Sequence, residues 1–308
     1  MSMPASILCP VDFSDASRGA LRYAATIAGH MSARLIVLTV EDPLLTQALD
    51  LGTGIVWEPE ISRHDLIDFV QKAFGAADTQ PVAIDYEIAV GKPAEQILKV
   101  ARERDCDLVV ISTHGLTGMR KLFFGSTTER VLRETTHPVL ITPAGDSGPV
   151  GVVEPKRLIG RILVPVDLSD ASLYQVQIAR RLGETLGVPL LLAHVIEPIH
   201  SRFAARLHLP SVESERRAAA EDKLDALIAT LPSTLHPEGL VIRGDPAEEI
   251  AKVARDRNAG LVVIGLHGSP LLGPRMGSVT YRVLCLVPTL TLALPPARRI
   301  APASADGK

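Results

Sequence analysis

The stretch GKPAEQILKVARERDCDLVVIS, residues 91–112, occurs again as GDPAEEIAKVARDRNAGLVVIG at residues 244–265. In both copies a proline opens a segment with apolar residues at helical spacing, which predicts a helix over 93–104 in the first copy. An apolar run follows and predicts a buried strand over 108–112 and again over 261–265. A helix joined to a fully apolar strand is typical of a parallel sheet that helices cover on both faces.

A second pair of matching segments indicates that a whole domain is duplicated. ILCPVDFSDAS at residues 7–17 matches ILVPVDLSDAS at residues 162–172. A repeat of this length predicts two tandem domains rather than a solenoid of short units. We predict a first domain over 1–145, a Gly- and Pro-rich linker over 146–159, a second domain over 160–296 and a flexible tail over 297–308.

Strands and helices alternate within each copy. Strands are predicted over 7–11, 35–40, 82–90, 108–112 and 139–142, and then over 162–166, 189–196, 240–243, 261–265 and 289–294. Predicted helices include one that follows an N-cap at Ser14 and others over 61–77, 93–104, 126–135 and 212–230. We therefore predict an α/β fold of two doubly wound, five-stranded parallel sheets, flavodoxin-like and of the adenine-nucleotide-binding type, with strand order 3-2-1-4-5.

Composition narrows the class of protein. Of the 308 residues 46% are hydrophobic and only 4% aromatic, which suits parallel sheets with aliphatic cores. A net charge of −3 argues against a nucleic-acid binder. The three cysteines lack metal-site spacing and predict free thiols in a reducing compartment. We expect no signal peptide and no membrane helix, and hence a cytoplasmic protein without a membrane or nucleic-acid partner.

A loop with two glycines follows the fourth strand of the first copy. Gly115 and Gly125 allow the backbone to approach a polyphosphate, and the helix that opens at Ser126 offers unpaired N–H groups there. A capping box between Ser126 and Glu129 is the structural alternative. We favour a phosphate site, because the loop lies at the crevice of the predicted sheet.

Asp12 ends the first strand and faces the same crevice. An ionised carboxylate only accepts hydrogen bonds, so Asp12 suits a ribose hydroxyl or an adenine amino group, with helix capping as the alternative. His114 and His267 occupy matching positions, but neither has a second metal ligand at suitable spacing, so no metal site is predicted. The sequence also lacks a nucleophile beside a base, which favours binding over catalysis.

The segment PVDFSDAS, a final strand HPVLIT and the pattern small-x2-Gly-x9-Gly-Ser resemble the universal stress protein family, in a tandem form. The resemblance implies a cytoplasmic, non-catalytic, stress-responsive protein that binds ATP or AMP, in some members with Mg²⁺. It also implies pairing through the last strands, within this chain and in a possible homodimer. One branch of the family lacks the motif and binds no nucleotide.

The resemblance assigns nucleotide contacts in both copies. In the first copy these residues are Pro10, Asp12, Val40, Ser112, His114, Gly115, Gly125, Ser126 and Thr127. In the second copy they are Asp167, Val195, Gly265, His267, Gly268, Gly277 and Ser278. Ser112 stands where the motif has glycine, and the second copy is one residue short between Gly268 and Gly277. The first copy is favoured as the nucleotide site; a nucleotide-free interaction module and a slow ATPase are the alternatives.

Overall fold

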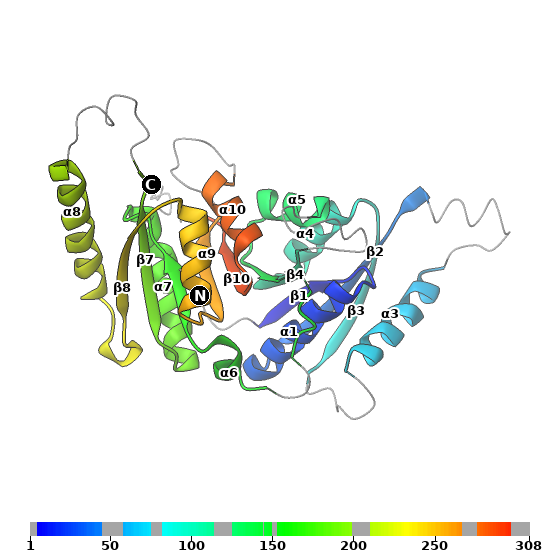
Figure 1. The fold of residues 1–308 in the computed structure, drawn as a ribbon. Helices are drawn as coiled ribbons and strands as arrows, with labels where there is room; N and C mark the ends of the chain where they lie inside the picture. The colour runs from blue at the N-terminus through cyan, green and yellow to red at the C-terminus, as the bar shows by residue number, and fades with distance from the viewer. Residues whose placement is uncertain are drawn as a thin grey trace, which may run out of the picture.

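A computed structural model describes residues 5–44, 58–74, 82–113, 125–143, 145–149, 153–198, 210–266 and 276–296. These residues form one ten-stranded sheet with helices on both faces (Figure 1). The strands follow the order β3-β2-β1-β4-β5-β10-β9-β6-β7-β8. Each half of this order is the predicted doubly wound arrangement, so the predicted fold class is confirmed.

The first half contains elements close to those predicted: β1 (Ser6–Pro10), α1 (Asp15–Met31), β2 (Arg34–Glu41), α3 (Pro59–Phe74), β3 (Ile84–Val90), α4 (Pro93–Glu103), β4 (Leu108–Ser112), α5 (Ser126–Glu134) and β5 (Val139–Thr142). Ser14 is the N-cap of α1, as predicted, and its hydroxyl accepts a 3.1 Å hydrogen bond from Ser17 N. The apolar runs and this cap are local signals, and they place these elements correctly.

The second half repeats the first: β6 (Ile162–Pro165), α7 (Asp170–Leu186), β7 (Leu190–Ile196), α8 (Pro210–Ile228), a short 3₁₀ helix (Ser233–Leu235), β8 (Glu238–Arg243), α9 (Pro246–Asp256), β9 (Leu261–Gly265), α10 (Ser278–Leu286) and β10 (Leu290–Leu294). The two halves meet where β5 and β10 pair antiparallel, with Leu140 opposite Leu292. The last strand of each domain therefore joins the two sheets into one.

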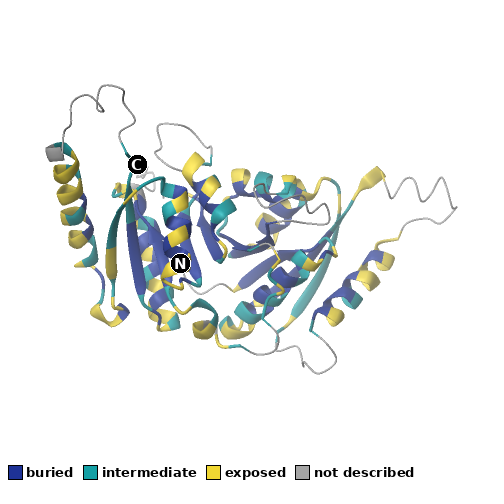
Figure 2. Ribbon diagram, viewed as in Figure 1, coloured by how far each residue is buried: buried dark blue, intermediate teal, exposed yellow. Residues whose placement is uncertain are grey.

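The core forms two apolar layers, one on each face of the sheet. Helices α1, α3, α7 and α8 cover one face, and α4, α5, α9 and α10 cover the other. Figure 2 shows the central strands buried, whereas the edge strands β3 and β8 are only partly covered. The crevices consequently lie at the carboxyl ends of β1 with β4 and of β6 with β9, where the strand order reverses.

The segment between the domains was predicted as a linker without regular structure, but it contains a helix. A helix, α6 (Pro155–Ile159), forms within it, and it is too short to show a helical period in the sequence. The start of the segment packs on α1, where an added Cβ on Gly19 would lie 2.2 Å from Asp146 O. Glycine at this position therefore allows the segment to approach the helix closely.

Candidate nucleotide-binding crevices

The crevice of the second domain is a cavity of about 610 Å³. It is lined by the predicted residues Asp167, Val195, Gly265, Gly277 and Ser278, together with Gln175, His194 and Arg216. The remaining predicted residues of this copy, His267 and Gly268, lie outside the described residues. The predicted residues that line this cavity come from four separate segments of the second domain, and they meet at the point where the strand order reverses.

Asp167 is held at the mouth of this cavity by its neighbours. Its Oδ1 accepts hydrogen bonds from Ser169 N (3.0 Å), from Ser169 Oγ (2.6 Å) and from the Ser172 hydroxyl. Burial raises the pKa of Asp167, but these hydrogen bonds outweigh burial and place its pKa below the ordinary value. The carboxylate is therefore ionised at neutral pH and accepts hydrogen bonds only.

Gln175 joins the two strands that diverge at the crevice. Its amide donates to Pro165 O at the end of β6, and its Oε1 accepts a 2.8 Å hydrogen bond from Gly265 N at the end of β9. The side chain is buried, so it satisfies two backbone groups that lie between strands. Gln175 is not among the residues predicted from the sequence; the available signal was that it replaces Ala20 of the first copy.

The end of β7 forms the adjoining wall. Val166 N donates a 2.8 Å hydrogen bond to Ala193 O, and Val195 lies two residues further along the strand. Backbone groups two residues apart in a strand point to the same side, so those of Val195 are directed toward the crevice. His194 Nδ1 donates to Val166 O over 2.9 Å, which fixes the ring beside the cavity.

The N-terminus of α10 closes the cavity. Gly277 is the N-cap residue, with φ −61° and ψ 143°, and no side chain caps the helix from that position. Gly277 N donates to Leu266 O (3.2 Å), and the Thr280 hydroxyl donates to Gly265 O (3.0 Å). These two bonds bring the first turn of α10 to the end of β9, where helix N–H groups attract anions.

The first domain repeats this anchoring. Gly125 N donates to Thr113 O (3.1 Å), and the Thr128 hydroxyl donates to Ser112 O (3.0 Å). Matching hydrogen bonds therefore form at the two ends of both loops. The one-residue difference in length falls between Thr113 and Gly125 in the first copy and between Leu266 and Gly277 in the second. The predicted residues His114 and Gly115 lie in that stretch, outside the described residues.

The capping box predicted as an alternative at α5 is wrong. Gly125, not Ser126, is the N-cap, and no side chain at that position caps the helix. Glu129 instead forms a 2.6 Å ion pair with Arg133, one turn further along α5. The first turn of α5 is therefore not closed by the proposed Ser126–Glu129 pair.

Gly125 itself is not required by the local structure. Its φ of −59° and ψ of 145° are accessible to any residue. An added Cβ would meet only Thr113 O, at 3.9 Å. Glycine leaves open space in front of the helix N-terminus, which is where a phosphate would approach.

Asp12 is held in a similar way to Asp167, although the Ser17 hydroxyl donates to Ser14 O where the matching Ser172 hydroxyl donates to Asp167. Its Oδ1 accepts from Ser14 N (3.2 Å) and from the Ser14 hydroxyl (2.5 Å), while Ser14 rather than Asp12 caps α1. The residue after each aspartate has a positive φ, 62° at Phe13 and 59° at Leu168. Such a conformation is rare for residues other than glycine and is concentrated at functional sites. No local sequence signal predicted it.

The other predicted residues of the first domain line the same end of the sheet. Pro10 is the last residue of β1, and Val11 N donates to Leu38 O over 2.8 Å. Val40 is two residues beyond Leu38, so its backbone groups point to the same side. Ser112 is the last residue of β4 and lies in the strand ladder opposite Thr142, so serine fits the backbone there. Ser126 and Thr127 open α5.

Three general properties complete this description. Among the described residues, no three His, Cys, Asp or Glu side chains gather as a metal site. None of the helices in the described ranges is long and apolar enough to cross a membrane. The three cysteines are free thiols.

Comparison with known proteins identifies the family. The universal stress protein family model matches residues 3–143 and again 159–293. A universal stress protein of Mycolicibacterium smegmatis is 26% identical over 290 residues, which cover 90% of this chain and 92% of that protein. The crystal structure of a Pseudomonas aeruginosa protein has the same fold, with a TM-score of 0.64, 16% identity and coverage of 95% of this chain and 93% of that one. A universal stress protein solved in complex with cAMP is 26% identical over 46% of this chain and 98% of its own, with a TM-score of 0.35. With two matches that together span most of its length, this chain belongs to the universal stress protein family as a tandem, two-domain member.

Proposed function

We propose that the chain binds ATP, or another adenine nucleotide, in the crevice of each domain and serves as a non-catalytic stress-response or regulatory protein of the cytoplasm. The observation that carries this proposal is the cavity of the second domain. Five residues selected from the sequence line that cavity, whose volume of about 610 Å³ lies within the range of small-molecule sites.

The geometry suggests a role for each part of the crevice. The N-termini of α10 and α5 would receive the phosphates, through the N–H groups that follow Gly277 and Gly125. Asp167 and Asp12 would accept hydrogen bonds from ribose hydroxyls or the adenine amino group. The backbone of Val195 and of Val40 would meet the adenine edge.

The two domains share the anchoring of the loop, the position of the aspartate and the uncapped helix. We therefore propose that both bind nucleotide, and the second domain supplies the stronger structural support. This ranking of the two domains differs from the sequence prediction, which favoured the first copy as the nucleotide site. Gln175 is one difference between the crevices, because the first domain has Ala20 in its place.

We also propose that the pairing of β5 with β10 holds the domains together in solution, and that a homodimer would require another surface. Thr291 in the ladder is only 2% exposed, so the junction is well covered. Light scattering coupled to gel filtration at several concentrations will give the mass. A single mass of one chain would reject the homodimer and leave the intramolecular pairing in place.

The nucleotide proposal is tested by what purified protein carries. Acid release followed by nucleotide chromatography should give an adenine nucleotide, and titration calorimetry of stripped protein should show up to two sites per chain. Asp12→Ala and Asp167→Ala should each remove one site. If no nucleotide is released and added ATP, ADP, AMP and cAMP neither bind nor raise the melting temperature, the chain is a nucleotide-free interaction module. Release of phosphate above background, lost in an aspartate variant, would favour the slow ATPase instead.

A further inference from the structure

A second cavity lies at the junction of the two domains, between helices α1 and α7. Helix α1 lies over β1 and β4, and α7 lies over β6 and β9, so β5 and β10 pass between these two helices. The cavity between them has a volume of about 420 Å³, within the range of small-molecule sites. None of its lining residues belongs to the nucleotide crevices described above.

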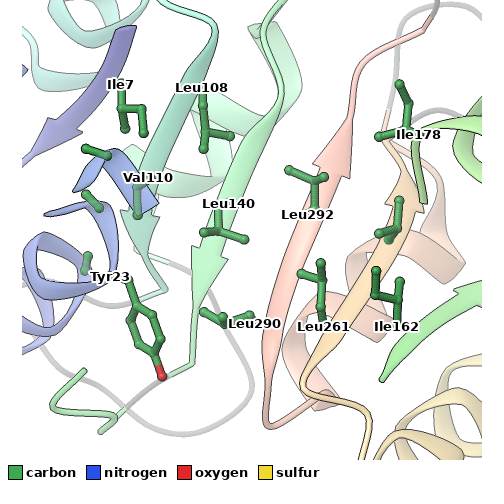
Figure 3. Packing of buried hydrophobic residues seen from close by; sticks show 14 of the residues in the cluster. Ile7, Tyr23, Leu108, Val110, Leu140, Ile162, Ile178, Leu261, Leu290 and Leu292 are labelled. Atoms are coloured by element: carbon green, nitrogen blue, oxygen red, sulfur yellow. The ribbon is translucent and has the colours of Figure 1, made fainter. Parts of the chain in front are cut away.

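The floor of this cavity is a row of leucines contributed by both domains. Figure 3 shows the row across β4, β5, β10 and β9, where it consists of Leu108, Leu140, Leu290, Leu292 and Leu261. Each of these side chains is at most 8% exposed. Ile27 and Met31 of α1 and Leu186 of α7 continue the apolar lining along the walls. A cavity of this composition gives water few hydrogen-bond partners and favours an apolar occupant.

Polar side chains complete the lining of this cavity: Tyr23, Thr26 and His30 come from α1, Thr185 from α7, and Glu154 and Lys156 from the segment between the domains. Helix α6 contributes Leu158 and Ile159 to the lining, together with Lys156 in its first turn and its N-cap residue Glu154. The Lys156 ammonium lies near Gly187, the C-cap residue of α7, at 3.9 Å from where an added Cβ would be. His30 on α1 is engaged with Val153 O at 3.1 Å, next to Glu154. Glu154 and Lys156 are only two residues apart, so the carboxylate and the ammonium both come from the N-terminal end of α6.

We propose that this cavity binds a medium-chain fatty acid. The alkyl chain would lie on the leucine row, because burial of CH₂ groups against an apolar floor is the favourable interaction that the cavity offers. The carboxylate would lie at the rim beside Lys156, where an ammonium group is the matching charge. Such a ligand contacts both domains at once and would tighten the junction of β5 with β10.

Decanoic acid is the probe, and decanol is its uncharged counterpart. In calorimetric titrations of the full chain, decanoate should bind with a stoichiometry of one and raise the melting temperature. Leu186→Trp fills the cavity from the α7 wall and should weaken decanoate binding by about tenfold or more. Leu173→Trp, on the same helix but at a 44% exposed position, is the matched control and should bind like the unmodified chain. Lys156→Met should weaken decanoate binding and leave decanol binding unchanged.

Three results would overturn the proposal. The first is that neither decanoate nor decanol binds at any concentration below micelle formation. The second is that decanoate binds Leu186→Trp and Thr26→Trp as tightly as it binds the unmodified chain. Thr26→Trp fills the cavity from the α1 wall and serves if Leu186→Trp fails to fold. The third is a dimer in sedimentation velocity that both filling variants abolish, because a second copy of the chain would then be the occupant.

Discussion

The Tyr23 hydroxyl donates a 2.7 Å hydrogen bond to the Asp146 carboxylate. Tyr23 belongs to α1 of the first domain, whereas Asp146 belongs to the segment that leads to the second. The same segment accepts a 2.9 Å hydrogen bond from Arg22 at Ser147 O. The connection between the domains is therefore anchored to the core helix of the first domain before it reaches α6.

Tyr23→Phe should lower the free energy of unfolding by about 0.5–1.5 kcal/mol at pH 7.5, the usual net contribution of one hydrogen bond. Burial, with the Asp146 carboxylate, raises the pKa of Tyr23 above its ordinary value. An unfolded tyrosine ionises near pH 10, so the contribution is fully present below about pH 10 and is lost as the pH rises toward the higher pKa of the folded state.

Urea unfolding at pH 7.5 and at pH 10.5 measures this difference. Tyr174→Phe, on the equivalent helix α7, is the control. An equal loss in both variants, or a Tyr23→Phe effect that grows with alkaline pH, would contradict the assigned role.

Lys92→Asp should stabilise the first domain. In the second domain the corresponding Asp245 caps α9, accepting 3.1 Å hydrogen bonds from Ala247 N and Glu248 N, whereas Lys92 provides no side-chain cap to α4. An N-cap side chain contributes about 0.5–2 kcal/mol, so the melting temperature should rise. Lys99→Asp, inside the same helix, is the control. It makes the same change of charge but cannot cap the helix, so it should not raise the melting temperature.

The cap at Asp245 predicts a pH dependence. The Arg282 guanidinium, 2.6 Å away, is the main reason that the pKa of Asp245 lies below its ordinary value. The stabilisation is therefore present above the pKa of the unfolded state and disappears as the pH falls through the lower pKa of the folded state. Asp245→Ala should destabilise at pH 7 and have little effect in strong acid; a constant effect in denaturant unfolding across this range would reject the ionic contribution.

Gly125→Ala and Gly277→Ala separate nucleotide binding from folding. Each residue is an N-cap at negative φ, so alanine should change stability by no more than about 1 kcal/mol. The added Cβ lies where phosphate would approach, and affinity at that site should fall by about tenfold or more. Calorimetry should show one remaining site in each single variant and none in the double variant. Unchanged titrations in all three would show that these helix N-termini do not bind the phosphates.

Gln175→Leu should destabilise the second domain by about 1–3 kcal/mol, the cost of leaving buried polar groups without partners. Leucine has a similar size but satisfies neither Pro165 O nor Gly265 N, both of which bond the glutamine amide. Thermal unfolding compares this variant with Gln71→Leu, an exposed substitution on α3. Equal melting temperatures for the two variants would mean that water replaces the amide at no cost.

Much of the fold followed from local patterns. The apolar runs that begin at Leu108 and Leu261 predicted β4 and β9 with the bounds that the structure shows. Ser14 predicted the start of α1, because a serine hydroxyl can accept the N–H of a residue three positions later. The duplicated segments predicted two domains, and the family model matches both.

The candidate site was predictable in part. Asp167, Val195 and Gly277 were selected from the sequence, and the structure places them around one cavity. Gln175 was not selected, because its importance lies in reaching two strand ends about ten and ninety residues away. The choice of Gly125 rather than Ser126 as N-cap depends on the hydrogen bond from Gly125 N to Thr113 O, across a loop whose shape the sequence does not reveal.

The sequence by itself determined the elements, their alternation and the duplication, since hydrophobic period and capping act within a few residues of the chain. Only the tertiary structure decided the antiparallel pairing of Leu140 with Leu292, the helix α6 between the domains and the apolar cavity below it. These features come from contacts between residues far apart in the chain. Their free energy depends on how two completed sheets meet, and no local pattern encodes that geometry.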